Sequence, residues 1–145
     1  MDRLKRNFYI ALIAFTAFSC GINEGGVRVT NGIEQYAIEY MKDKQLLHAN
    51  EEVLAYYDYT IILDGTESVI LTDKRLIYHN AQTETKYVLL TDISHVDHIK
   101  DPLIGDIIRV KSTSGKQFKV AIAPFNEGYV FLDMLRKKVP VSERT

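Results

Sequence analysis

The stretch Val69-Ile70-Leu71-Thr72-Asp73-Lys74-Arg75-Leu76-Ile77-Tyr78 contains two apolar runs separated by four polar residues. The central polar residues favour a tight turn, and the aliphatic and aromatic residues on both sides favour strands. The pattern therefore predicts a hairpin with strands over 67–72 and 75–79. Turn chemistry and alternation explain the whole stretch, so we interpret it as a folding signature in which Arg75 forms an ion pair or extends over the end of the sheet.

Strand-like segments continue on both sides of this hairpin. A segment over 53–63 precedes it, and Asp64-Gly65 provides a turn between the two. Further along the chain, the expected strands are 86–90, 93–99, one containing Ile108 and Val110, and one containing Phe118, Val120 and Ile122. The sequence thus predicts seven strands.

The last two strands can be aligned residue by residue. Residues opposite each other in an antiparallel ladder share a face, and a two-residue loop would pair Val110 with Lys119 and mix the faces. A three-residue loop over 113–115 instead pairs Val110 with Phe118. It also places Gly115 at the left-handed position that such a loop requires, so we predict this register.

An amphipathic helix is expected on each side of the strands. Apolar residues recur at helical spacing over 32–48, where Asn31 can act as the N-cap. We expect this apolar side to pack on the domain, although it could instead be a partner surface. A second helix is predicted up to Lys138, with Asn126 as its N-cap and basic residues at its C-terminal end.

Seven strands followed by one helix is the order of the pleckstrin-homology (PH)-like barrel. The hairpin resembles the "LT-x-KR-L-I" motif of bacterial PH domains, and Leu90-Thr91-Asp92-Ile93 followed by Val96 resembles their "L-x-D-I-x-x-V" segment. Related GRAM-type domains contain similar motifs. The resemblance covers about 50–138 and implies a mainly β (α+β) fold over 50–139: a PH-like seven-strand open barrel with a C-terminal capping helix and an extra N-terminal helix.

The PH resemblance implies binding rather than catalysis. Some members of the fold bind phosphoinositides through basic residues in the first loop between strands, but here that loop, 63–67, is acidic. A phosphate ligand requires Lys, Arg or free backbone donors, so no phosphoinositide site is expected. The candidate binding surface predicted from the sequence comprises Tyr57, Tyr59, Lys74 and Arg75.

The first twenty residues resemble the export signal of bacterial lipoproteins. A basic start is followed by an apolar run from Phe8 to Phe18, eleven residues with no charge, which is too short for a comfortable transmembrane helix. Ser19-Cys20 then resembles a lipobox, although Ala17 stands where leucine is usual. The resemblance implies a signal peptide over 1–19 and lipidation of Cys20, commonly with palmitate. The alternative is an uncleaved anchor or a buried helix.

This resemblance also implies a location. Two or three acyl chains form a stable anchor, whereas one is marginal, so the mature chain is expected to be held in a bacterial envelope. Gly21 follows the cysteine, which favours the outer membrane if the source is Gram-negative. We expect a flexible glycine-containing tether over 20–31 and a polar tail over 140–145.

Composition and motifs exclude several functions. The formal net charge of −1 argues against nucleic-acid binding, and one cysteine excludes an internal disulfide. In His95-Val96-Asp97-His98, His98 would point away from the first His and the Asp on a strand, so no metal or cofactor is expected. No phosphate loop or nucleophile elbow occurs, so we do not expect an enzyme.

The resulting hypothesis is a membrane-tethered envelope lipoprotein. It would act as a non-catalytic PH-like binding module for an envelope protein partner. The alternative is a carrier of lipid or another hydrophobic ligand, held between the sheets of the barrel.

Overall fold

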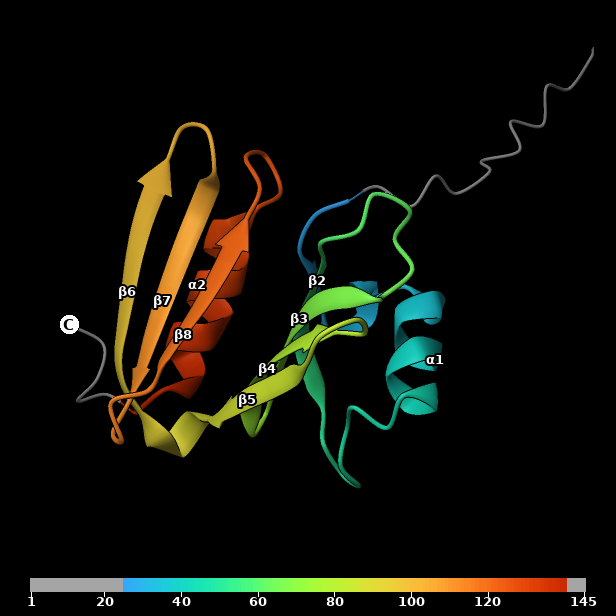
Figure 1. The fold of residues 1–145 in the computed structure, drawn as a ribbon, viewed down its shortest axis with the longest axis horizontal. Coiled ribbons are helices and arrows are strands. Elements are labelled where there is room, and N and C mark those ends of the chain that lie inside the picture. The colour runs from blue at the N-terminus through green and yellow to red at the C-terminus, as the bar shows by residue number, and fades with distance from the viewer. Residues whose placement is uncertain (1–24, 141–145) are drawn as a thin grey trace, which may run out of the picture.

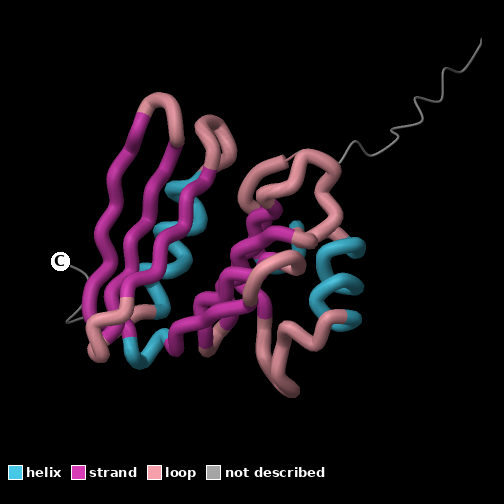
Figure 2. The backbone as a smooth tube through the Cα atoms, in the orientation of Figure 1, coloured by secondary structure: helices cyan, strands magenta, loops and turns pink. Residues whose placement is uncertain are grey.

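The computed structural model describes residues 25–140, which form two antiparallel sheets and two α-helices (Figures 1 and 2). The larger sheet has the order β1-β2-β3-β4-β5 and the smaller sheet the order β6-β7-β8. The strands are β1 (Arg28–Val29), β2 (Val53–Asp58), β3 (Glu67–Thr72), β4 (Arg75–Asn80), β5 (Thr85–Leu89), β6 (Ile93–Asp101), β7 (Gly105–Ser112) and β8 (Gln117–Ile122). The helices are α1 (Gln35–Asp43) and α2 (Gly128–Lys138), with 3-10 turns η1 (Thr30–Gly32) and η2 (Leu90–Asp92).

Both hairpins that were read from the sequence are confirmed. β3 and β4 pair antiparallel, with Leu71 opposite Leu76 across the predicted turn. β7 and β8 pair with Val110 opposite Phe118, as the three-residue loop requires. Gly115 has a φ of +82°, the left-handed conformation expected at that position.

The main core lies between the two sheets and is closed by α2. Side chains from both sheets and from α2 are fully buried there, among them Val69, Leu71, Leu76, Ile108, Val120, Phe131 and Leu135. Figure 1 shows α2 running behind β7 and β8, on the side that faces the larger sheet. The fold is therefore mainly β, with two sheets forming an open rather than a closed barrel and a helix at its C-terminal end.

A second, smaller core lies on the other face of the five-stranded sheet. Ala37 and Met41 of α1 pack there against Tyr56, Ile70 and Ile77. The apolar side of the N-terminal helix thus packs on the domain, as expected.

The N-terminal boundaries differ from the prediction. The tether expected over 20–31 is wrong from residue 27 onward, because Val27 is buried and Arg28 lies opposite Tyr56 in a strand pair. The helix expected over 32–48 is shorter, Gln35–Asp43. Asn31 lies in η1 instead of acting as a cap, and Gln45 has a φ of 53°, which is incompatible with continuing the helix.

Two later boundaries also differ. The strand expected over 53–63 ends at Asp58, because the following loop turns around that side chain. Asn126 does not cap α2. Its Nδ2 donates to the hydroxyl of Tyr57 at 3.0 Å, and the helix starts at Gly128.

Several predictions concern residues outside the described range. The signal peptide over 1–19, the lipidated Cys20, the first part of the tether and all but the first residue of the tail lie there. Within residues 25–140, no helix is long and apolar enough to cross a membrane.

Candidate functional site

The tyrosines of the predicted binding surface lie inside the barrel. Tyr57 is buried, Tyr59 is half-buried, and their rings meet edge to face with centroids 5.0 Å apart. The Tyr59 hydroxyl accepts a hydrogen bond from the amide of Ala121, and the Tyr57 hydroxyl accepts one from the amide of Ala123, both at 3.3 Å. Burial raises the pKa of Tyr59. The pair therefore links the C-terminal end of β2 and the residue after it to the C-terminal end of β8 and the loop that follows.

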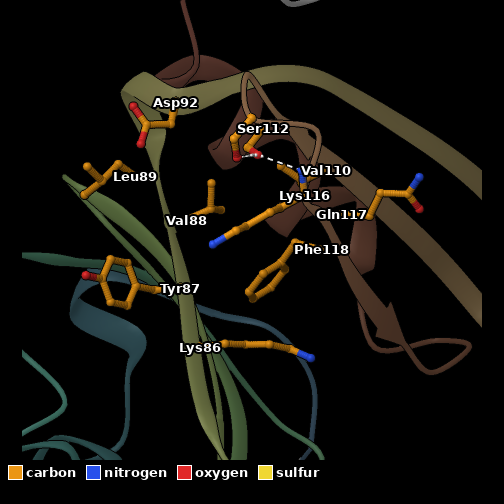
Figure 3. Close-up of a pocket in the computed structure, with 11 residues that line it drawn as sticks. Lys86, Tyr87, Val88, Leu89, Asp92, Val110, Ser112, Lys116, Gln117 and Phe118 are labelled. Carbon is orange, nitrogen blue, oxygen red and sulfur yellow. Dashed lines mark hydrogen bonds between the residues drawn. The ribbon is translucent and has the colours of Figure 1, made fainter.

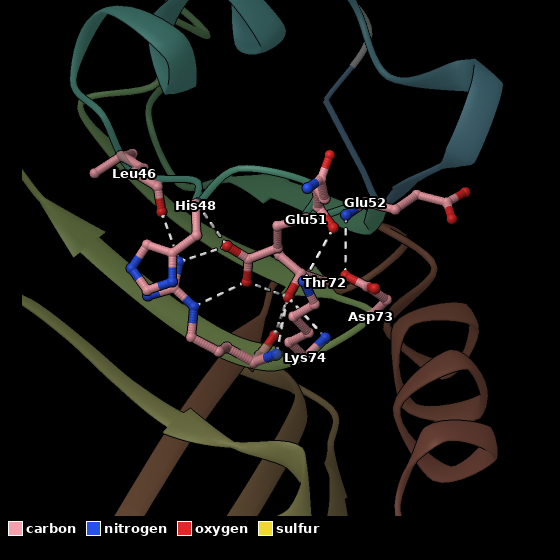
Figure 4. A network of polar contacts seen from close by, with 9 residues as sticks. Leu46, His48, Glu51, Glu52, Thr72, Asp73 and Lys74 are labelled. Atoms are coloured by element: carbon pink, nitrogen blue, oxygen red, sulfur yellow. Dashed lines mark hydrogen bonds and ion pairs between the residues drawn. The ribbon is translucent and has the colours of Figure 1, made fainter.

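Arg75 is also buried and forms an ion pair, as one reading of the sequence anticipated. Its guanidinium donates to both carboxylate oxygens of Glu51, at 2.8 and 2.6 Å, and to the carbonyl of Leu46 at 3.0 Å. Thr72 donates to Glu51 at 2.7 Å, and the amide of His48 donates to it at 2.8 Å. Figure 4 shows this network, which fastens the segment after α1 to the β3–β4 turn.

The protonation of Glu51 reflects these contacts. Burial by itself raises the pKa of this carboxyl, but the hydrogen bonds from Arg75, the His48 amide and Thr72 outweigh that effect and lower the pKa to about 2. The carboxylate is therefore charged at neutral pH, and its side chain is fully buried. We interpret Glu51–Arg75 as a structural brace.

The four residues predicted from sequence do not form one surface. Tyr57 and Tyr59 face the space between the sheets, whereas Arg75 lies in the brace on the other side of the larger sheet, where it stacks 4.9 Å from the ring of Tyr87. Lys74 is exposed, and its Nζ donates to the carbonyl of Asn50 at 3.0 Å. The four residues thus lie at separate places in the fold.

A cleft of about 360 Å³ opens between β5 and the β7–β8 hairpin. We call it the open cleft. It is lined by Lys86, Tyr87, Val88, Leu89, Asp92, Val110, Ser112, Ser114, Lys116, Gln117 and Phe118. In Figure 3 the side chain of Lys116 extends towards Val88, and Phe118 lies between that pair and Lys86. An apolar floor is thus flanked by two lysines.

The walls of the open cleft are the edge strands of the two sheets. The amide of Asn80 donates to Glu84, and the amide of Leu90 donates to Lys74, so the bonded pairs of the β4–β5 ladder occupy even-numbered positions. Antiparallel ladders alternate bonded and non-bonded pairs. The N–H and C=O groups of Thr85, Tyr87 and Leu89 consequently point away from β4.

The same reasoning applies to β8. The amide of Ser112 donates to Lys116, so the bonded pairs of β7–β8 include Val110 with Phe118. The backbone groups of Gln117 and Lys119 therefore point away from β7. Two sheet edges with outward-directed backbone groups meet at one cleft, an arrangement that can accept an extended peptide.

The histidine motif does not form a metal site. Among residues 25–140 there is no group of three His, Cys, Asp or Glu side chains placed to hold a metal ion. His98 contacts Asp106 with 2.7 Å between Nε2 and Oδ1, and Asp97 pairs with Arg109 at 2.9 Å. His95 is exposed on the outer face of the smaller sheet.

The loop that binds phosphoinositides in some PH domains is held by a buried acid. Asp58 accepts hydrogen bonds from the amides of Thr60 and Gly65, both at 2.8 Å, and from the hydroxyls of Tyr36 and Tyr56. Burial and the adjacent carboxylate raise the pKa of Tyr56. The loop carries no basic residue, as the sequence indicated.

The open cleft was missed from sequence for a geometric reason. Its two walls, β5 and β8, are separated by 27 residues (90–116) and belong to different sheets, and no local pattern shows that they meet. The recurrence of Phe118, Val120 and Ile122 at every second position did identify β8 correctly.

Comparison with known proteins agrees with this architecture. A family model described as "Bacterial PH domain" matches residues 47–137, and the chain belongs to that family. A crystal structure of a DUF1696 family protein with a pleckstrin-homology domain from Shewanella loihica PV-4 superposes with a TM-score of 0.54 at 13% identity. The match covers 72% of this chain and 97% of the other. No curated protein matches the chain.

Proposed function

We propose that this PH domain is a non-catalytic binding module that receives an extended segment of a protein partner in the open cleft. The observation that carries the proposal is the meeting of two sheet edges, β5 and β8, along one apolar cleft. A strand added there would satisfy the outward-directed backbone groups of both edges. Val88 and Phe118 would contact its apolar side chains.

The charge of the cleft indicates which segment it would accept. Lys86 and Lys116 line the cleft, and Lys119 lies farther along β8. Asp92 lies at one end, and Glu84 pairs with Lys86 at 3.2 Å. An extended segment that alternates apolar and acidic residues would match this pattern, and the charges would fix its orientation.

The carrier alternative finds less support in the geometry. A carrier requires a cavity between the sheets, but the side chains there, including Leu76, Ile108 and Val120, are completely buried against one another. The open cleft lies at the edge of the barrel and not within it.

We further propose that the module is held at an envelope membrane by lipid on Cys20. The basic start, the short apolar run and Ser19-Cys20 support this proposal. Replacing Cys20 with Ala would leave the chain uncut and without lipid, as measured by intact mass after membrane extraction. Normal processing of this variant would contradict the anchor but not the cleft.

The cleft is tested by a photo-crosslinking amino acid at Leu89 in the full-length chain in cells. Capture of one reproducible protein through the cleft, and not through a crosslinker at exposed Lys138 of α2, supports the proposal. Recovery of lipid alone would favour the carrier.

A backbone test uses the captured partner. Tyr87→Pro removes an amide that points outward from an edge strand, where proline is tolerated, and Tyr87→Ala removes only the ring. Binding that weakens about fivefold to tenfold more in the proline variant than in the alanine variant indicates strand addition. Equal losses would contradict it.

A further inference from the structure

Large apolar side chains are exposed at the tips of three separate loops. Ile61 and Ile62 of the β2–β3 loop are 100% and 78% exposed. Leu103 of the β6–β7 loop is 89% exposed, Ile104 beside it is half exposed, and Phe125 of the β8–α2 loop is fully exposed. We call these five residues the apolar rim. Such residues are unusual at loop tips, where water would ordinarily meet polar groups.

The three loops point towards one end of the molecule. Figure 1 shows the β6–β7, β8–α2 and β2–β3 loops along its upper side, whereas η2 and the β7–β8 turn lie at the opposite end. Figure 2, in the same orientation, draws these segments as loops. Two of the loops are also in contact through a shared groove, lined by Pro102 from one and by Phe125 from the other. The residues of the apolar rim thus belong to three loops on the same side of this view, two of which line one groove.

The backbone holds these side chains outward. Asp101 Oδ1 accepts the amides of Leu103 and Ile104, at 2.8 and 2.9 Å, which shapes the β6–β7 tip. Phe125 has a φ of 68°, which is rarely adopted by a bulky residue and costs free energy unless something offsets it. The turns of these two loops therefore fix the exposed positions of Leu103, Ile104 and Phe125.

The course of the chain identifies what the apolar rim faces. The amide of Val27 donates to the carbonyl of Asn126 at 3.0 Å, so the N-terminal segment joins the domain next to Phe125. Four residues lie between Cys20 and Gly25, so the five steps from one to the other span at most about 18 Å when fully extended. A bilayer that holds Cys20, or the apolar run before it, would lie within reach of the apolar rim.

We propose that the apolar rim inserts into the surface of a lipid bilayer and orients the domain on it. This rests on the membrane attachment proposed above. Apolar tips that enter the boundary between headgroups and acyl chains bind through buried apolar area and need no basic residues. The acidic loop around Asp64 and the absence of arginine from these three loops agree with insertion that does not depend on anionic lipid. The open cleft would then be held at a defined angle to the membrane.

The test exploits the absence of tryptophan from the chain. Phe125→Trp places a single reporter in the apolar rim, where the side chain is exposed and substitution should not disturb the core. Leu89→Trp places a matched, partly exposed reporter beside η2 at the opposite end. Each full-length variant is coupled through its single cysteine, Cys20, to vesicles of uncharged phosphatidylcholine that contain a maleimide lipid.

We expect the Phe125→Trp emission to shift to the blue on the vesicles and to lose most of its intensity when brominated phospholipid is included. The Leu89→Trp emission should change little. Adding Ile61→Ser and Ile62→Ser to Phe125→Trp should restore much of the quenched intensity, because shallower insertion moves the reporter away from the bromines.

Two outcomes would overturn the proposal. Equal quenching at both positions would show that the domain has no preferred orientation, and no quenching at position 125 would show that the apolar rim stays in water. Because coupling through Cys20 replaces the natural lipid, the result does not depend on whether cells lipidate this cysteine. Failure of the proposed anchor is detected separately by Cys20→Ala.

Discussion

The two sheets differ in how many of their faces are covered. The five-stranded sheet packs against the smaller sheet on one face and against α1 on the other, and β3 is buried from Ser68 to Thr72. The three-stranded sheet is covered on one face only, and β8 alternates exposed and buried residues along most of its length. The register of a half-exposed strand can therefore be read from its alternation of apolar and polar residues. A strand covered on both faces lacks this alternation.

The largest expected effect comes from the Glu51–Arg75 brace. This brace holds the segment that follows α1, the helix that covers the outer face of the five-stranded sheet. Glu51→Ala would leave the buried guanidinium of Arg75 without its counter-charge and should lower the free energy of unfolding by about 4 kcal/mol. Denaturant titration measures this value. The matched control is Asp133→Ala in the exposed Asp133–Lys137 pair, which should change stability by no more than about 0.5 kcal/mol. Equal effects would show that Glu51 does not brace the fold.

The covered and uncovered outer faces can be compared directly. Ile70→Ala removes a fully buried side chain beneath α1 and should cost about 3 kcal/mol in unfolding free energy. Lys111→Ala changes an exposed residue on the outer face of the smaller sheet and should remain within about 0.5 kcal/mol of wild type. A small effect of Ile70→Ala would mean that α1 does not cover this face in solution.

The pH dependence of stability should reveal the brace without a large change in packing. The folded-state pKa of Glu51 is lowered from the ordinary 4.5 to about 2, so its stabilisation is complete above the higher value and is lost as the pH falls towards the lower one. About 2 kcal/mol should disappear between about pH 5 and about pH 3. Urea unfolding across this range should show the loss in wild type and much less of it in Glu51→Gln. Parallel pH profiles would contradict the assignment.

The smallest expected effect tests the register of the half-exposed sheet. Gly115→Ala should cost about 1 kcal/mol, because nothing lies within 4 Å of the added methyl group and only the left-handed backbone opposes it. Gly115→Asn should cost less, since asparagine tolerates this conformation. Thermal unfolding compares the two variants. No difference between them would indicate that the loop can relax to another turn.

The sequence predicted local features correctly where one interaction dominated. Turn chemistry at Thr72-Asp73 and alternation around Phe118 were sufficient for both hairpins. The predicted boundaries of helices, strands and the tether were wrong where distant groups competed with a local signal. Asn126 is a good N-cap by composition, but its amide binds Tyr57, and Arg28 pairs with a strand although its neighbours are glycine-rich.

The candidate site was less predictable than the fold. Tyr57 and Arg75 have residue types that are common in binding surfaces, yet Tyr57 links β2 to the loop after β8 and Arg75 is held by Glu51. The carboxylate partner of Arg75, Glu51, lies 24 residues away in sequence. No short motif could therefore show that the guanidinium already forms an ion pair.

The sequence by itself determined the family motifs, the succession of seven strands from residue 53 onward, the register of the last hairpin and the absence of a basic phosphate-binding loop, because each depends on residues that are neighbours along the chain. The eighth strand, β1, was not predicted. Only the tertiary structure decided which face α1 covers, that β5 and β8 form the open cleft, and that three apolar loop tips point the same way. These features depend on how the two sheets pack against each other, and that arrangement arises from the summed burial of side chains from both sheets and from α2.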